Sequence, residues 1–169
     1  NKDKIFDLLN INGGFSKNIT IKKGNYGLGV YTQNSSKKVE LFLPQKLLID
    51  TSKLTLDNNY NLKINDNNND ELIKKFFKLY FENYGFNINT KKEIDIFLKN
   101  LNNLSTILKD YLKFFFNKIF FEHKFTQKDY LNLYLNSRQI KIQNKNYFMP
   151  LIELINHSTE GTEYLVSEG

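Results

Sequence analysis

The sequence has no cysteine and few of several other residues with special chemistry. Its 169 residues include no Trp and only two His, which are His123 and His157. The absence of Cys excludes disulfides, zinc sites built on Cys and thiol nucleophiles, and it fits a reducing compartment. Because two His are too few for a His-rich metal centre, no metal is expected.

Long apolar runs are lacking as well. The most apolar segment, residues 112–121, is interrupted by Lys113, Asn117 and Lys118. It is too short and too charged to span a bilayer. The first residues are charged and no long apolar segment follows them, so no signal peptide is expected. The sequence therefore predicts a soluble cytoplasmic protein without a membrane partner.

Positive charge is in excess, and nearly all of it comes from lysine. The formal net charge is +6 and the pI is about 9.3. Such a charge favours acidic partners in general, and nucleic acid is one of them. The lysines are scattered over the polar faces of predicted helices, however, which is more typical of a solvated surface.

The residue pattern changes twice along a chain that is long enough for one domain with a buried core. Residues 1–65 are predicted to be rich in β-structure, because short alternating segments are separated by Gly and Asn turns. Residues 66–136 are predicted to be helical, and residues 137–169 return to strands and loops. The strands are expected near residues 19–21, 26–32, 39–43, 139–147 and 164–166.

Capping residues mark the expected starts of the helices. Asp70 precedes apolar residues at helical spacing, and Ser105 and Thr126 do the same further on. Thr90 and Glu93 have the spacing of a capping box, in which hydroxyl and carboxylate bind exposed backbone amides reciprocally. Four or so packed helices are therefore expected.

A glycine-rich strand runs from Gly24 to Val30, with Gly27 and Gly29 on either side of Leu28. Glycines in a strand let a ligand or another backbone approach closely. A cofactor shelf and a plain turn or bulge are both compatible with this pattern. It is not the dinucleotide fingerprint, because the third glycine is missing and the segment leads into another strand.

Arg138 follows Ser137 at the end of the last predicted helix and is the only arginine in the sequence. A cation at a helix end is often merely solvated and favoured by the helix dipole. The guanidinium can alternatively clamp a carboxylate or phosphate with a fixed fork of donors, which Lys cannot do. Both interpretations stay open on this residue alone.

An apolar run from Met149 to Ile155 ends abruptly in Asn156, His157 and Ser158. A single His after such a run is often a satisfied core residue, and Asn can cap a turn. His157 could also act as a general base. No Ser-His-Asp arrangement is evident from the spacing.

In this order, the segments resemble a SET-domain protein lysine methyltransferase of the branch typified by the Rubisco large-subunit methyltransferase. That family has a Gly-x-Gly strand, a strand ending in Pro, a helical insert ending in Ser-Arg, and an apolar segment leading to Asp-x-x-Asn-His-Ser. The corresponding segments here are Tyr26–Tyr31, Leu41–Pro44, residues 70–138 and Met149–Ser158. The resemblance spans about residues 19–166. It implies a single α+β domain with a SET fold of small twisted β-sheets and a helical insert.

The resemblance also implies a cofactor, S-adenosylmethionine, and a substrate, a protein that presents a lysine. In the family the Gly-x-Gly strand contacts the cofactor through its backbone, which here implies Tyr26, Gly27 and Leu28. Arg138 matches the arginine that holds the cofactor, and Asn156 with His157 matches the pair that seats its amino-acid and adenine portions. Tyr164 falls where the family has an aromatic residue beside the lysine channel.

The chain departs from the family pattern in two places. Glu153 stands where the family often has Asp. The family's last motif, with the Tyr that orients the substrate amine, is not found within the 169 residues, so no catalytic residue is assigned. Two alternatives to a methyltransferase stay open. One is a SET-like protein that binds cofactor or peptide without methylating, and the other is a basic nucleic-acid-binding adaptor.

Overall fold

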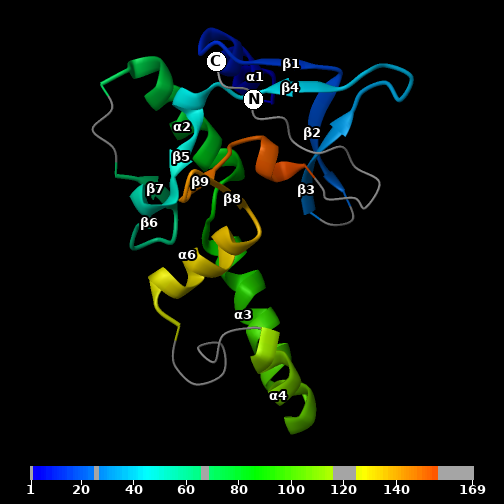
Figure 1. Cartoon of the computed structure of the whole chain (residues 1–169), viewed down its shortest axis with the longest axis vertical. Helices are drawn as coiled ribbons and strands as arrows, with labels where there is room; N and C mark the ends of the chain where they lie inside the picture. The colour runs from blue at the N-terminus through cyan, green and yellow to red at the C-terminus, as the bar shows by residue number, and fades with distance from the viewer. Residues whose placement is uncertain (1, 25–26, 66–68, 116–124, 156–169) are drawn as a thin grey trace.

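A computed structural model describes residues 2–24, 27–65, 69–115 and 125–155 (Figure 1). The chain begins with helix α1 (Lys2–Ile11), which the sequence analysis missed by treating the whole N-terminal part as β-rich. The side chains of Ile5 and Leu9 are fully buried, and α1 packs against α2 (Glu71–Tyr84). Buried Asn12 fixes this contact, since its amide donates to the backbone oxygens of Leu8 and Leu72.

The three strands predicted in the first fifty residues are confirmed. They are β2 (Ile19–Gly24), β3 (Gly27–Thr32) and β4 (Glu40–Phe42), and a further short strand, β1 (Phe15–Lys17), precedes them. β2 pairs with β3 in an antiparallel hairpin, and β1 pairs with β4. Buried Ile19 and Ile21 alternate with more exposed residues along β2, the pattern of a strand with one face on the core.

The segment after Pro44 contains more regular structure than the sequence suggested. Two short 3-10 turns, η1 (Gln45–Leu47) and η2 (Thr51–Lys53), flank strand β5 (Ile49–Asp50). A second hairpin follows, formed by β6 (Leu54–Leu56) and β7 (Leu62–Ile64).

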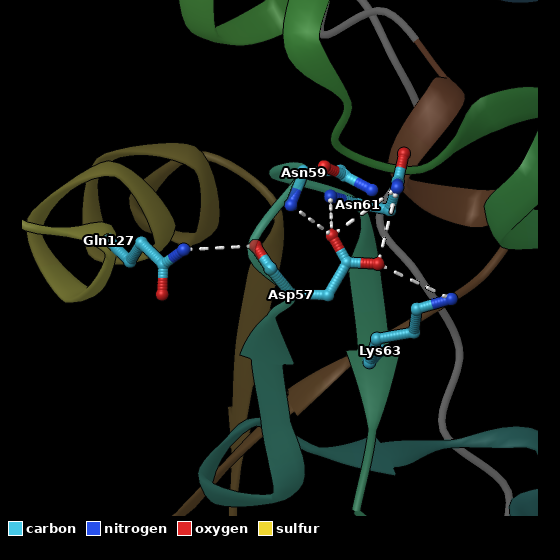
Figure 2. A network of polar contacts seen from close by, with 5 residues as sticks. All are labelled: Asp57, Asn59, Asn61, Lys63 and Gln127. Carbon is cyan, nitrogen blue, oxygen red and sulfur yellow. Dashed lines mark hydrogen bonds and ion pairs between the residues drawn. The ribbon is translucent and has the colours of Figure 1, made fainter.

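Asp57 organises the turn of this second hairpin (Figure 2). Its carboxylate accepts hydrogen bonds from the backbone amides of Asn59 at 2.9 Å and Asn61 at 2.8 Å. The Nζ atom of Lys63 lies 3.6 Å from Oδ2 of the same carboxylate. The Asn61 amide is the main reason why the pKa of Asp57 is lowered. A short Asp side chain that binds the backbone ahead of it is a common way to stabilise a turn.

The helical part begins with α2, and Asp70 caps it as predicted by accepting from the amides of Leu72 and Ile73. The next helix, α3 (Ile88–Asn102), contradicts the predicted capping box at Thr90. Its cap is Asn87, which accepts from the amides of Asn89 and Thr90, so Thr90 lies inside the first turn. Asn87 directly follows the buried Phe86, and its side-chain oxygen reaches two amides of the first turn, so the helix begins three residues earlier than predicted.

The last two described helices begin where the sequence predicts. Ser105 precedes α4 (Thr106–Phe115) and accepts from the amide of Leu108. Thr126 precedes α6 (Gln127–Asn136) and forms a capping box with Asp129. In Figure 1, α3 and α4 extend away from the sheets, and Ile107 on α4 is 82% exposed.

The predicted C-terminal hairpin is also confirmed, as β8 (Gln139–Ile142) and β9 (Lys145–Phe148). β9 pairs on its other side with β5, which gives the sheet order β5-β9-β8. The described chain ends after the 3-10 turn η3 (Ile152–Leu154). The strand predicted at residues 164–166 lies outside the described residues.

The arrangement is a mixed α and β fold with small antiparallel sheets, as the sequence predicts at that level. One buried cluster joins residues from α1, β2, the β6–β7 hairpin, α2, α6 and β9. None of the helices in the described part of the chain combines the length and apolar character that crossing a bilayer requires.

Candidate functional site

The structure describes three of the seven residues that the sequence analysis placed in the cofactor and substrate site. These are Gly27, Leu28 and Arg138. The other four, Tyr26, Asn156, His157 and Tyr164, lie outside the described residues.

The start of strand β3 requires glycine. Gly27 has a φ of +99°, in the region that side chains with a Cβ rarely adopt, and a Cβ built there would meet no heavy atom within 4 Å. The reason for glycine here is therefore the backbone conformation and not crowding. Leu28 is 42% exposed, so the strand presents an apolar side chain next to the free space at Gly27.

The turn η3 lies beside β3, although more than half of the chain separates them in sequence. Figure 1 shows η3 between the β8–β9 hairpin and the β2–β3 hairpin. Leu151, which precedes η3, is fully buried and has a φ of +70°. A buried Leu in this region is strained, and the surrounding packing must hold it there. The segment leading to Asn156 is thus fixed next to the glycine-bearing strand.

Arg138 lies just after α6, where its backbone amide donates to the Leu135 oxygen. Its guanidinium lies 4.3 Å from the centre of the Tyr134 ring, and Nη1 donates to the Tyr134 backbone oxygen and the Ser137 hydroxyl. Stacking on an aromatic face while binding oxygen acceptors uses the planar geometry that Lys lacks. This accounts for an arginine in a chain whose other basic residues are lysines.

A buried carboxylate joins Arg138 to η3. The Nε atom of Arg138 lies 3.1 Å from Oε2 of Glu153, whose side chain is only 1% exposed, against 36% for Arg138. The N–H is poorly aligned with Oε2, which finds no hydrogen-bond donor among the described residues, so charge is the main attraction. The other oxygen, Oε1, accepts from the Tyr80 hydroxyl at 2.6 Å.

Burial dominates the electrostatics of this cluster. It raises the pKa of Glu153, and the Tyr80 hydrogen bond and Arg138 oppose that rise. Burial also raises the pKa of Tyr80 and of Tyr134, and the neighbouring carboxylate adds to both shifts. The Tyr134 hydroxyl is buried and finds no hydrogen-bond partner among the described residues.

This cluster of Tyr80, Tyr134, Arg138 and Glu153 brings α2, α6 and η3 together. Of these residues, Arg138 was predicted from the sequence as a site residue, and Glu153 stood out only as a departure from the family pattern. Tyr80 and Tyr134 are among the residues at helical spacing after Asp70 and Thr126, which by itself indicates only a buried helix face. A buried carboxylate needs hydrogen-bond or charged partners. In the sequence, the single arginine was the only indication that Arg138 has such a specific partner.

The arrangement can bind an anion or a polar cofactor more readily than a metal. Arg138 carries donors beyond the Nε and Nη1 groups used above, and the space beside the Gly27 Cα is free of heavy atoms within 4 Å of a Cβ placed there. Among the described residues, no group of three or more His, Asp or Glu side chains could hold a metal ion.

A groove with a volume of about 910 Å³ lies elsewhere among the described residues. It runs between α6 and strand β6, and it reaches Gln139 but not Gly27, Leu28 or Arg138. The described candidate cofactor residues therefore do not line this groove.

Three comparisons, with protein-family models, with curated proteins and with solved structures, found no match to this chain.

Proposed function

We propose that the protein is an S-adenosylmethionine-dependent methyltransferase that acts on a protein lysine side chain. The observation that carries this proposal is the convergence of three segments that are far apart in sequence. β3 with Gly27 and Leu28 lies beside η3, and Arg138 is joined to η3 through Glu153. These are the segments that the SET-domain resemblance assigns to one cofactor site.

The fold is compatible with this proposal. Small antiparallel sheets, a helical segment between them and a C-terminal hairpin before η3 follow the order that a SET domain with a helical insert requires. The order of the motifs along the chain is the reason for proposing a SET domain. The convergence of these motifs in space supports a shared cofactor site.

Each residue of the site has a role that suits the cofactor. The carboxylate of the methionyl portion needs a cation with several donors, which Arg138 offers at its exposed side. The free space beside Gly27 and the exposed Leu28 suit close contact with a flat, partly apolar group. Asn156 and His157, which follow η3 in the sequence, are the proposed partners of the remaining polar groups.

Thermal unfolding with and without S-adenosylmethionine tests cofactor binding. At a cofactor concentration of about 100 times Kd, the gain is about 2.7 kcal/mol, which corresponds to a rise in Tm of about 5–10 °C. Arg138→Ala should abolish the rise, and Arg138→Lys should reduce it, because Lys retains the charge but not the fork of donors.

Lys141→Ala, which removes an exposed cation from β8, is the matched control and should keep the full rise. If the unaltered protein gains no stability from S-adenosylmethionine, the proposed cofactor is wrong. Transfer of a labelled methyl group to lysines of host-cell proteins then separates an enzyme from a protein that only binds the cofactor.

A further inference from the structure

The 910 Å³ groove has a β-strand edge as one wall. Three consecutive residues of β6, Leu54, Thr55 and Leu56, line it. Side chains alternate between the two faces of a strand, so a groove that touches three in a row runs along the backbone edge. Among the described residues β6 pairs with β7 alone, which leaves this edge without a strand partner.

The register of the hairpin shows which backbone groups point to that edge. The amide of Asp57 donates to the Asn61 oxygen, and the amide of Asn65 donates to the Lys53 oxygen. Hydrogen-bonded pairs alternate along an antiparallel ladder, so Thr55 bonds to Lys63 in β7. The N–H and C=O of Leu56 and the C=O of Leu54 therefore point away from β7, toward the groove.

One face of α6 forms the opposite wall. Leu131 and Leu135 lie low in the groove, and Lys128, Asn132 and Asn136 follow its rim at a spacing of four residues. The ten residues of α6 are about 15 Å long, which is the length of about five extended residues.

The two walls are joined at one end. The Gln127 amide donates to the Asp57 backbone oxygen at 2.9 Å, which connects the first turn of α6 to the turn of the β6–β7 hairpin (Figure 2). The Asp57 network holds that turn in place. The groove between the walls is thus closed at this end and has fixed sides.

The rim is polar and carries more positive than negative charge. Lys128 and Lys145 line it together with one carboxylate, Asp50. The Asp50 carboxylate accepts from the Ser52 hydroxyl at 2.7 Å and from the Ser52 amide at 3.0 Å, and these bonds lower its pKa. Its charge is therefore partly satisfied within the protein, which leaves the groove favourable to an acidic ligand.

We propose that this groove binds an extended, acidic peptide segment of a partner protein as an added strand on the free edge of β6. Main-chain hydrogen bonds to Leu54 and Leu56 would supply affinity, as in other cases of strand addition. The peptide side chains that point into the groove contact its leucines and are therefore apolar. A carboxylate of the peptide binds Lys128 or Lys145. The site is separate from the proposed cofactor site and does not depend on methyl transfer.

A fluorescent synthetic peptide of alternating valine and threonine, with glutamate at each end, is the probe. We expect saturable binding by fluorescence anisotropy, and on binding the amide of Leu56 should become protected from hydrogen exchange. The same peptide with N-methylated backbone amides should bind at least tenfold more weakly, because it cannot donate to the strand edge.

Charge reversal tests the rim. Lys128→Glu and Lys145→Glu should each lower the affinity for the glutamate-ended peptide by about fivefold. Each should raise the affinity for a lysine-ended version of the peptide. Lys92→Glu, the same change at an exposed position of α3 outside the groove, should leave both affinities unchanged.

Any one of four results would overturn the proposal. Three of them are no binding of the probe, equal binding of the N-methylated peptide, and equal binding by the Lys128→Glu and Lys145→Glu variants. Protection of the Leu56 amide in the protein without peptide would also overturn it, because residues of this chain would then occupy the edge.

Discussion

Glu153 shows at the scale of a single residue how the candidate site is held together. Its carboxylate is buried, and the hydroxyl of Tyr80 on α2 and the guanidinium of Arg138, just after α6, reach it from two sides. A buried charge without partners is strongly destabilising, so each partner of this carboxylate supports the position of η3.

The two buried tyrosines of this cluster should respond differently to loss of the hydroxyl. Tyr80→Phe removes the donor to Glu153 and should lower the free energy of unfolding by about 2 kcal/mol. Tyr134→Phe removes a buried hydroxyl that has no partner among the described residues, and should change that free energy by between zero and a gain of about 1 kcal/mol. Urea unfolding of both variants measures the difference. Equal losses for the two would contradict the assigned contacts.

Glu153 should also give the protein a specific dependence on pH. Its pKa is raised in the folded state above the ordinary value of 4.5, so the folded protein holds this proton where the unfolded chain has lost it. The contribution to stability is full below pH 4.5 and is lost as the pH rises through the folded-state pKa.

The measurement is the free energy of unfolding of the unaltered protein minus that of Glu153→Gln, followed upward from pH 4. We expect this difference to fall by about 1.4 kcal/mol for each unit of the pKa shift. Glu93→Gln, on the exposed face of α3, is the matched control. A difference that rises with pH would mean that the ion pair with Arg138 outweighs burial.

At the scale of elements, short polar residues decide where the helices begin. Asp70, Asn87 and Thr126 each bind backbone amides of the following turn, which would otherwise lack partners. The caps at Asp70 and Thr126 are predictable from the sequence, whereas the pattern around Thr90 predicts a cap three residues after the true one, Asn87.

Substitution at both candidate positions tests the start of α3. Asn87→Ala should lower the free energy of unfolding by about 1 kcal/mol, because it removes the acceptor for the amides of Asn89 and Thr90. Thr90→Ala, inside the first turn, should change it by less than about 0.5 kcal/mol. Thermal unfolding compares the two, and a larger loss at Thr90 would restore the original prediction.

At the scale of the whole molecule, α1 belongs to the same core as the later helices. Ile5 and Leu9 share the buried cluster with Phe76 of α2 and with Leu131 of α6. A helix from the first residues of the chain therefore supports the segments that carry the candidate site.

Ile5→Ala tests this long-range support. The substitution leaves a cavity at a fully buried position and should lower the free energy of unfolding by about 3 kcal/mol. The α6 amides that exchange only through global unfolding should report the same decrease in the free energy of unfolding. Ile11→Ala, at a position of α1 that is 58% exposed, should have little effect. A loss confined to α1 would show that it unfolds independently.

Local patterns were sufficient for most individual elements. Strands β2, β3 and β4, the β8–β9 hairpin and the helix starts at Asp70, Ser105 and Thr126 follow from alternation, turn residues and caps within a few positions. Helix α1 and the β6–β7 hairpin were missed. The first is short and contains several charged residues. The second alternates over only three residues in each strand, within an Asn-rich segment whose turn is held by the Asp57 network.

The sequence by itself determined the mixed α and β character, the order of motifs and the unusual status of Arg138, because these depend on residue type and spacing along the chain. Only the tertiary structure decided that η3 lies beside β3, that Glu153 binds both Arg138 and Tyr80, and that α6 and β6 border a groove. Such contacts join segments that are far apart in sequence, as the separation of 73 residues between Tyr80 and Glu153 illustrates. They arise from burial of a common core, which no local pattern of residues specifies.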